Sequence, residues 1–462
     1  MDKFIQSVSD IIWSPALVVL LVCTGLYLSV RTGFVQLRRI GLMFRTLFDF
    51  KSKKEGSISS FEAFCIALSG RVGTGNIMGV AAAIAFGGPG AVFWMWMVAF
   101  FGASSAFTES TLAQLYKVRN GESFRGGPAF YIANGLKCKW LAVLFAVLTI
   151  IGCGLFATTV QSNGMTRALT NAFGVPSIVG GIILAVLLAL VVIGGAKRIA
   201  RVAGIVTPFM AVGYIMLSLV VVAINWRAVP GAFQSIFEGA FGINPVCGGI
   251  LGSTIAMGVK RGLFSNEAGQ GTGAIPSAAA SVEYPAQQGL AQAFSVYVDT
   301  LFVCTATALM IITTGMYNVI NQSTGEVLVA YAPELGADFS GYTQSAICSA
   351  LGPAGGIFVG IAMTFFAFTT TLAYYFYVES SFVYLFDGRN NRWLKVLKYG
   401  FCVLYFACVF YGALKESGVV WTLADIGIGS MAWINVIAIL ILSPQAFKAL
   451  KEYEGFVGKR KK

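Results

Sequence analysis

The sequence contains no histidine. This absence excludes imidazole metal ligands, and it excludes catalytic triads and proton relays that depend on histidine. Charged residues are scarce, at 11% of the chain, where soluble domains carry roughly 25%. None of the nine cysteines forms a CxxC pair, and most lie in apolar stretches, so we interpret them as small apolar fillers. The chemistry of soluble enzymes is therefore largely missing.

What the sequence has in abundance is apolar residues, at 57% of 462, together with 54 glycines. Both are typical of membrane proteins, and the N-terminal apolar run lacks a cleavage site, so we interpret it as a first span. Hydropathy predicts an all-α membrane protein with one transporter domain over 1–462 and eleven spans. The expected spans are 11–30, 58–86, 89–116, 140–165, 176–196, 203–224, 246–280, 288–314, 353–384, 399–414 and 418–442.

Lysine and arginine alternate between the connections. The connections after spans one, three, five and nine and the C-terminal tail carry most of them, and each other connection holds at most one. The positive-inside rule then predicts an outside N-terminus and a cytoplasmic C-terminus, in a prokaryotic plasma membrane. The net charge of +12 reflects this topology rather than a nucleic-acid partner.

Three connecting segments carry further expectations. The sequence predicts that residues 31–57 form a cytoplasmic amphipathic linker, which either lies on the membrane or packs against the protein. Residues 326–351 predict an extracellular loop with a short helix, and 443–462 a basic cytoplasmic tail.

Two apolar spans are interrupted by polar and glycine-rich stretches. SGRVGTGNIMG (69–79) breaks the second span, and MGVKRGLFSNEAGQGTGAIPS (257–277) breaks the seventh. Irregular backbone survives in a bilayer only where it lines a cavity or is buried in protein. The two breaks lie five spans apart on spans of opposite direction, which predicts inverted repeats of five helices. Such paired interruptions indicate a transporter's binding site.

The first break predicts two functions. A half-helix that starts near Gly75 and Asn76 presents amides and a positive dipole end to a carboxylate, with Thr74 adding a hydroxyl. The carbonyls that end the preceding half, near Ser69 to Val72, suit a sodium ion. The alternative is that these glycines only permit close helix packing.

In the second break, we expect the carbonyls near Phe264 and Ser265 to accept hydrogen bonds from an ammonium group. Glu267 is an acid inside a span, which is costly unless it is paired. Its candidate partners are Arg71 or the adjacent Lys260 and Arg261, and we favour a structural or gating ion pair over a substrate contact. Among the other intramembrane acids Glu109 and Asp299 lie deepest, and we favour structural roles over ion coupling for both.

Several blocks together resemble the alanine/glycine:cation symporter family, which includes sodium:alanine symporters. They are GTGNI, GVAAAIAFGGPGAVFWMW, GGAKRIARVA, RGLFSNEAGQGTG and QGLAQAF, within a similarity that runs through 15–442. The resemblance implies a leucine-transporter-type fold of five plus five helices, with one extra N-terminal helix. It also implies uptake of a small neutral amino acid, usually alanine or glycine, with sodium or sometimes protons.

The resemblance also implies site residues. For substrate these are Thr74, Gly75, Asn76, Gln161, Phe264, Ser265 and Tyr374, and for sodium they are Ser69, Val72, Thr369 and Thr370. From the residues alone, the threonine run could equally bond its own helix carbonyls. Ala373 and Tyr374 replace a Gly-Trp pair typical of the family, so serine and glutamine stay open as cargo beside alanine and glycine.

The sequence therefore predicts a secondary active symporter that works by alternating access. We expect a monomer in the lipid bilayer, with sodium as coupling ion and no cofactor. A proton-coupled carrier is the first alternative. A channel would need a filter repeat or a charged ring, and an intramembrane enzyme would need a carboxylate pair or a GxSxG elbow; neither is visible.

Overall fold

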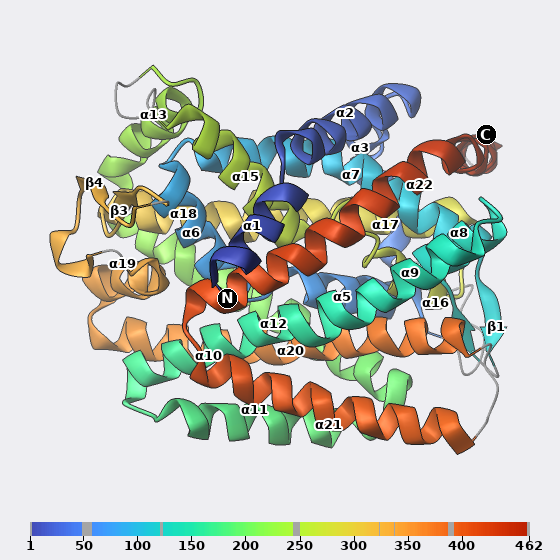
Figure 1. Cartoon of the computed structure of the whole chain (residues 1–462). Helices are drawn as coiled ribbons and strands as arrows, with labels where there is room; N and C mark the ends of the chain where they lie inside the picture. The colour runs from blue at the N-terminus through green and yellow to red at the C-terminus, as the bar shows by residue number, and fades with distance from the viewer. Residues whose placement is uncertain are drawn as a thin grey trace.

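The computed structural model describes residues 2–48, 58–120, 123–243, 250–322, 324–336, 338–386 and 392–459. Within them the chain is a bundle of helices with two small antiparallel hairpins, β1 with β2 and β3 with β4 (Figure 1). The expected all-α membrane fold is confirmed.

The first half of the chain holds sixteen of the elements, among them 3₁₀ turn η1 and π-helical segment η2. They are α1 (Asp2–Ile12), α2 (Pro15–Arg31), α3 (Val35–Arg38), α4 (Ile40–Leu47), α5 (Ser60–Arg71), η1 (Thr74–Asn76), α6 (Met78–Gly87), α7 (Ala91–Leu115), β1 (Val118–Asn120), β2 (Ser123–Arg125), α8 (Pro128–Asn134), α9 (Lys139–Thr149), η2 (Ile150–Ala157), α10 (Thr158–Phe173), α11 (Ser177–Val192) and α12 (Gly195–Ile224).

The second half contains a further π-helical segment, η4, and three 3₁₀ turns, η3, η5 and η6. The elements are η3 (Trp226–Ala228), α13 (Val229–Ala240), α15 (Leu251–Asn266), α16 (Ala274–Ala279), α17 (Pro285–Val296), η4 (Tyr297–Cys304), α18 (Thr305–Thr314), β3 (Asn318–Ile320), β4 (Val327–Ala330), η5 (Pro333–Leu335), η6 (Phe339–Gly341), α19 (Tyr342–Leu351), α20 (Pro353–Leu385), α21 (Arg392–Leu414) and α22 (Ser417–Lys459).

Eight helical stretches of the described residues are long and apolar enough to cross a membrane. Two of the eleven expected spans, the second and the seventh, are the broken ones, so each is split into shorter helices. A third, α11, has only 16 residues. The linker at 31–57 contains α3 and α4, with 49–57 outside the described residues. Helix α22 runs on to Lys459, so much of the expected tail is helical.

The first broken helix begins at a capping box, in which Ser59 Oγ accepts a hydrogen bond from the Glu62 amide while the Ser59 amide donates to Glu62 Oε2. Helix α5 ends at Arg71, because Val72 is extended, and α6 starts after η1. The second broken helix, α15, stops before a turn that needs Gly269 and Gly271 at φ 89° and 94°, which side-chain-bearing residues rarely adopt. The break expected in each span is confirmed.

The two broken helices run in opposite directions (Figure 1). At one end the Ser281 amide, after α16, donates to the carbonyl of Ile58, before α5, over 3.0 Å. At the other end Thr254 Oγ1, near the start of α15, donates to the carbonyl of Gly87, at the end of α6, over 2.7 Å. This antiparallel pairing is the arrangement that inverted repeats produce.

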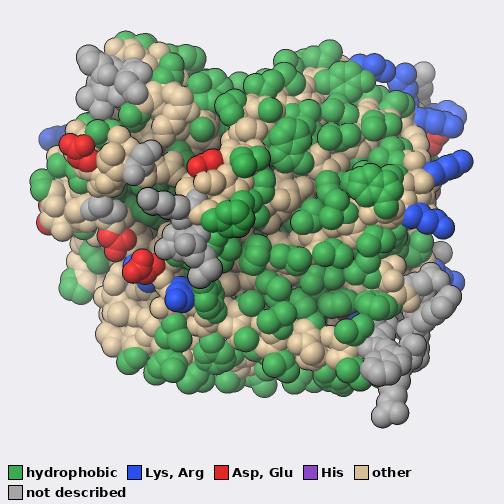
Figure 2. Space-filling model, viewed as in Figure 1, with side chains coloured by type: hydrophobic (Ala, Val, Ile, Leu, Met, Phe, Trp, Pro, Cys, Tyr) green, Lys and Arg blue, Asp and Glu red, His purple; other side chains and the backbone are tan. Residues whose placement is uncertain are grey.

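Polar groups gather at the two ends of the bundle. Figure 2 shows most Lys and Arg side chains of the visible face at the end that holds the C-terminus and β1, and most Asp and Glu side chains at the end that holds β4 and α19. Hydrophobic side chains cover the surface between them. An apolar belt between two polar ends is what a bilayer requires.

Helices approach closely where both carry glycine. A Cβ built on Gly152 of η2 would lie 3.1 Å from the backbone of Gly427 in α22. We expect Gly427→Ala to force these segments apart and to lower the melting temperature of the purified protein by several degrees, since overpacking costs about 1–3 kcal/mol. Gly400→Ala in α21 is the matched control, because its Cβ would meet nothing within 4 Å. Equal melting temperatures for both variants would contradict the expectation.

Candidate functional site

The two breaks contact each other in the middle of the bundle. Arg71 Nε, at the end of α5, donates to the carbonyl of Asn266, the last residue of α15, over 2.7 Å. A Cβ on Gly75 would lie 3.1 Å from Cδ1 of Phe264. The stretches that the sequence singled out therefore form one buried centre.

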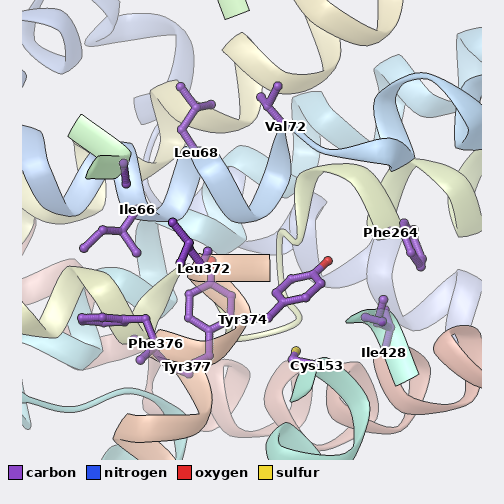
Figure 3. Close-up of a cluster of buried hydrophobic side chains, with 14 of the residues drawn as sticks. Ile66, Leu68, Val72, Cys153, Phe264, Leu372, Tyr374, Phe376, Tyr377 and Ile428 are labelled. Carbon is purple, nitrogen blue, oxygen red and sulfur yellow. The ribbon is translucent and has the colours of Figure 1, made fainter. Parts of the chain in front are cut away.

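Gln161 from α10 binds the first break. Its Oε1 accepts hydrogen bonds from both the amide and the hydroxyl of Thr74, each over 3.0 Å. The hydroxyl of Tyr374 from α20 lies beside the Gln161 side chain. Figure 3 shows Tyr374 close to Tyr377 and Cys153, with Phe264 and Ile428 on the far side of its hydroxyl. Three expected substrate residues from three different elements thus meet at one place.

Asp299 joins the two breaks to each other. Its Oδ1 accepts a hydrogen bond from Asn76 Nδ2 over 2.5 Å, and both of its carboxylate oxygens accept from Ser265 Oγ, over 3.1 and 3.0 Å. Thr300 Oγ1 donates to Oδ2 over 2.7 Å. The carboxylate is completely buried and belongs to π-helical η4, and π-helical segments frequently mark functional sites.

Three of the four expected sodium ligands lie together. Thr370 Oγ1 donates to the carbonyls of Ser69 and Val72, over 2.7 and 3.3 Å. Thr369 lies elsewhere: its hydroxyl donates to Phe365 O within its own helix over 3.0 Å and contacts Met210 of α12. The helix-carbonyl alternative therefore describes Thr369, while Thr370 faces the first break.

The sequence profile of the sodium:alanine symporter family matches residues 1–462. This chain belongs to the sodium:alanine symporter family. A sodium/proton-dependent alanine carrier protein of Bacillus sp. (strain PS3) is 45% identical over 87% of this chain and 89% of its own. The amino-acid carrier protein AlsT of Bacillus subtilis is 42% identical (98% and 93%), and the sodium/alanine symporter AgcS of Methanococcus maripaludis is 37% identical (96% and 94%). The family makes this chain a transporter and not an enzyme.

The ion-pair partners expected for Glu267 from the sequence differ from those in the structure. Among the described residues Arg71 has no ion pair with Glu267; instead its guanidinium donates to Asn266 O, to Gln292 Oε1 over 2.9 Å and to Ser295 Oγ. The hydroxyl of Tyr377 donates to Glu267 Oε2 over 3.3 Å. A direct Arg71–Glu267 ion pair is therefore absent from this structure, and the gating role stays a prediction.

Lys260 and Arg261 do not pair with Glu267 either. Both bind the same oxygen, Oδ2 of Asp425 in α22, over 2.8 and 2.5 Å. The Arg261 guanidinium also covers the ring of Trp421, at 4.5 Å from the centroid. Trp421 in turn packs on Phe264, with ring centroids 4.7 Å apart. This cluster covers the buried centre on the side where α15 begins.

Sequence reasoning recognised Asp425 as an intramembrane acid but not as the partner of Lys260 and Arg261. It missed Trp421, and it favoured a structural role for Asp299. The available signal was an acid inside an apolar span, which by default indicates function. Glu109 is also buried, where its Oε2 accepts from Asn435 Nδ2 over 2.8 Å, and Asn435 Nδ2 reaches the Gly269 carbonyl over 2.9 Å. Asn435 of α22 thus joins Glu109 of α7 to the second break.

Proposed function

We propose that this chain imports a small neutral amino acid, alanine or glycine in the first place, together with sodium. The observation that carries the proposal is the meeting of two antiparallel broken helices at a buried polar centre, in a member of the sodium:alanine symporter family. The names of the relatives, sodium/alanine symporter and sodium/proton-dependent alanine carrier, support this cargo and ion.

The substrate would bind between the breaks. Its carboxylate suits the N-terminal end of the α6 half-helix at Thr74, Gly75 and Asn76, where amides and the dipole favour an anion. Its ammonium would take carbonyls near Phe264 and Ser265, where α15 ends. Gln161, which accepts hydrogen bonds from Thr74, and the neighbouring Tyr374 would then face the side chain of the amino acid.

Sodium would bind beside the substrate at the end of α5. The carbonyls of Ser69 and Val72 already share the hydroxyl of Thr370, and all three oxygens are hard donors of the kind that sodium prefers. An ion there would hold the first break in its bound shape. Linkage then requires that sodium raise substrate affinity and that substrate raise sodium affinity equally.

Alternating access needs a seal on each side of the centre. The Phe264–Trp421 ring pair and the Arg261–Asp425 ion pair close the side where α15 begins. We propose that this side faces outward, because lysine and arginine gather at the opposite end with the C-terminus (Figure 2). The chain would thus lie as a monomer in a prokaryotic plasma membrane, with its N-terminus outside.

The test is uptake of radiolabelled alanine into proteoliposomes that contain the purified protein. A symporter accumulates alanine when sodium is high outside, and accumulation stops when the sodium gradient is removed. Accumulation driven by an acid exterior without sodium would support the proton-coupled alternative. Rapid equilibration without accumulation would indicate a channel and would overturn the proposal.

Tyr374 is expected to set the size of the cargo. Tyr374→Trp enlarges the ring that lies beside Gln161 and Cys153, so the pocket becomes narrower. We expect competition by glutamine to weaken about tenfold or more relative to competition by serine, since one or two heavy atoms in a pocket change discrimination by about 10–200-fold. Tyr399→Trp is the control, because Tyr399 is exposed on α21. An unchanged glutamine-to-serine ratio in Tyr374→Trp would remove Tyr374 from the pocket.

A further inference from the structure

The turn of the second break carries three buried oxygens without a hydrogen-bond donor. They are Glu267 Oε1, Gln270 Oε1 and Thr272 Oγ1, on side chains that are at most 1% exposed. The hydroxyl of Thr272 lies beside the Glu267 carboxylate, and Gln270 directs its Nε2 toward Cys153 Sγ at 3.8 Å. Buried polar atoms are almost always satisfied, so three unpaired oxygens on one turn, one of them a carboxylate oxygen, indicate a partner from outside the chain, either a water or a cation.

The backbone of this turn is also strained in the manner of a functional site. Glu267 has φ 54°, in the left-handed region that a non-glycine residue seldom adopts. Gly269 and Gly271 at positive φ then reverse the chain, so that Gln270 and Thr272 follow Glu267 around one tight turn. The three side chains therefore belong to one tight turn, and that turn carries a cost in strain.

The charges of the buried centre also favour a partner from outside the chain. The charged side chains buried between the breaks and the surrounding helices are Arg71, Glu109, Lys260, Arg261, Glu267, Asp299 and Asp425. Asp425 compensates one of the two cations that bind it, so this outer group has one positive charge in excess. The inner group sets one arginine against three carboxylates, and the sum over both groups is negative. A buried carboxylate without a cationic partner takes up either a proton or a cation from outside the chain.

Arg71 does not serve as that cation for Glu267. Its guanidinium is held by Asn266 O, Gln292 and Ser295, and a Cβ on Gly273 would touch Arg71 Nη2 while lying 3.8 Å from Glu109 Oε1. The arginine therefore lies toward Glu109. Asp299 has its own donors from Asn76, Ser265 and Thr300. Glu267 is left with hydroxyl neighbours, Tyr377, which donates to Oε2, and Thr272 beside the carboxylate.

We propose that the turn of the second break binds a second sodium ion through Glu267 Oε1, Gln270 Oε1 and Thr272 Oγ1. A carboxylate, an amide oxygen and a hydroxyl are hard oxygen donors, which suit a small cation. This inference rests on the proposed symport and adds a second coupling ion to it. The site is separate from the one at Ser69, Val72 and Thr370, and each ion orders one of the two breaks.

The second ion has a measurable consequence for transport. At zero membrane potential, a tenfold sodium gradient sustains about tenfold accumulation of a neutral amino acid with one sodium per substrate, and about a hundredfold accumulation with two. The charge moved per alanine doubles in the same way. Both quantities can be measured on the unmodified chain.

The test is equilibrium binding of radioactive sodium to the purified full chain, with three variants. We expect about two sodium ions per unmodified chain and about one in Glu267→Gln, which removes the charge but keeps the shape of the side chain. Thr370→Val is expected to lose the other ion. Glu379→Gln is the matched control and keeps about two, because Glu379 is an intramembrane acid that already pairs with Arg125 at 3.6 Å and Lys398 at 3.9 Å.

Each result separates this inference from the proposed symport. Sodium binding by Glu267→Gln at the unmodified stoichiometry would overturn the second site. If Glu267→Gln does not fold, the charge moved per alanine by the unmodified chain is the test. A value of about one would overturn the second site and leave sodium symport intact. A second charge carried by protons, seen as acidification of the vesicle lumen, would overturn its assignment to sodium. Absence of any sodium-driven uptake by the unmodified chain would instead overturn the proposed symport itself.

Discussion

Asn76→Ala is expected to lower the rate of sodium-driven alanine uptake by about 100-fold or more. Asn76 bonds in two directions: its Oδ1 accepts from the Gly73 amide over 2.8 Å and its Nδ2 donates to the Asp299 carboxylate. Alanine would leave a buried amide and a buried carboxylate each short of a partner. A hydrogen bond to a charged group contributes about 1.5–3 kcal/mol, and about 1.4 kcal/mol corresponds to a factor of ten.

Uptake into proteoliposomes and the amount of folded protein, measured together, check this expectation. Asn225→Ala is a suitable control, since Asn225 only caps α12 through the Val221 carbonyl. If the loss comes from the stranded carboxylate, Asn76→Ala should cost much less in an Asp299→Asn background, which a double-mutant cycle measures. Normal uptake by folded Asn76→Ala would contradict the placement of the substrate at the first break.

The two breaks could be predicted because their cause is local. Glycine, threonine and asparagine within an apolar span are incompatible with a lipid-facing helix, whatever surrounds them. Gly269 and Gly271 show the reason directly, as both adopt positive φ in the turn. The opposite direction of the two breaks also followed from the charge alternation, because topology depends on lysine and arginine in the connections.

The partners of the site residues could not be predicted because they depend on register and helix rotation. Asp299 meets Asn76 across 223 residues, and it faces inward from a π-helical segment that hydropathy does not reveal. Sequence also could not assign a partner to Arg261, which forms an ion pair with Asp425 in α22 and not with the nearby Glu267. In both cases the candidate pairs have the right chemistry, and only packing of distant helices selects one of them.

The neighbours Thr369 and Thr370 make the same point, and they supply the second prediction. Consecutive helix positions lie about 100° apart, so one threonine can face the first break while the next one faces another helix. Thr370 reaches the carbonyls of Ser69 and Val72, and Thr369 reaches Met210. Family resemblance assigned both to sodium, and the structure brings only Thr370 to those carbonyls.

Thr370→Val is therefore expected to raise the sodium concentration for half-maximal alanine uptake by about 100-fold. Valine keeps the shape of threonine and removes the oxygen, so the bound ion loses a ligand; an interaction with a charged group contributes about 1.5–3 kcal/mol, and about 1.4 kcal/mol corresponds to a factor of ten. Thr369→Val should keep the sodium dependence of the unmodified chain, because its hydroxyl is bonded within α20. The measurement is alanine uptake against sodium concentration in proteoliposomes. Equal shifts for both variants would mean that sodium binds elsewhere or that α20 turns during transport, and a shift for Thr369→Val alone would reverse the assignment.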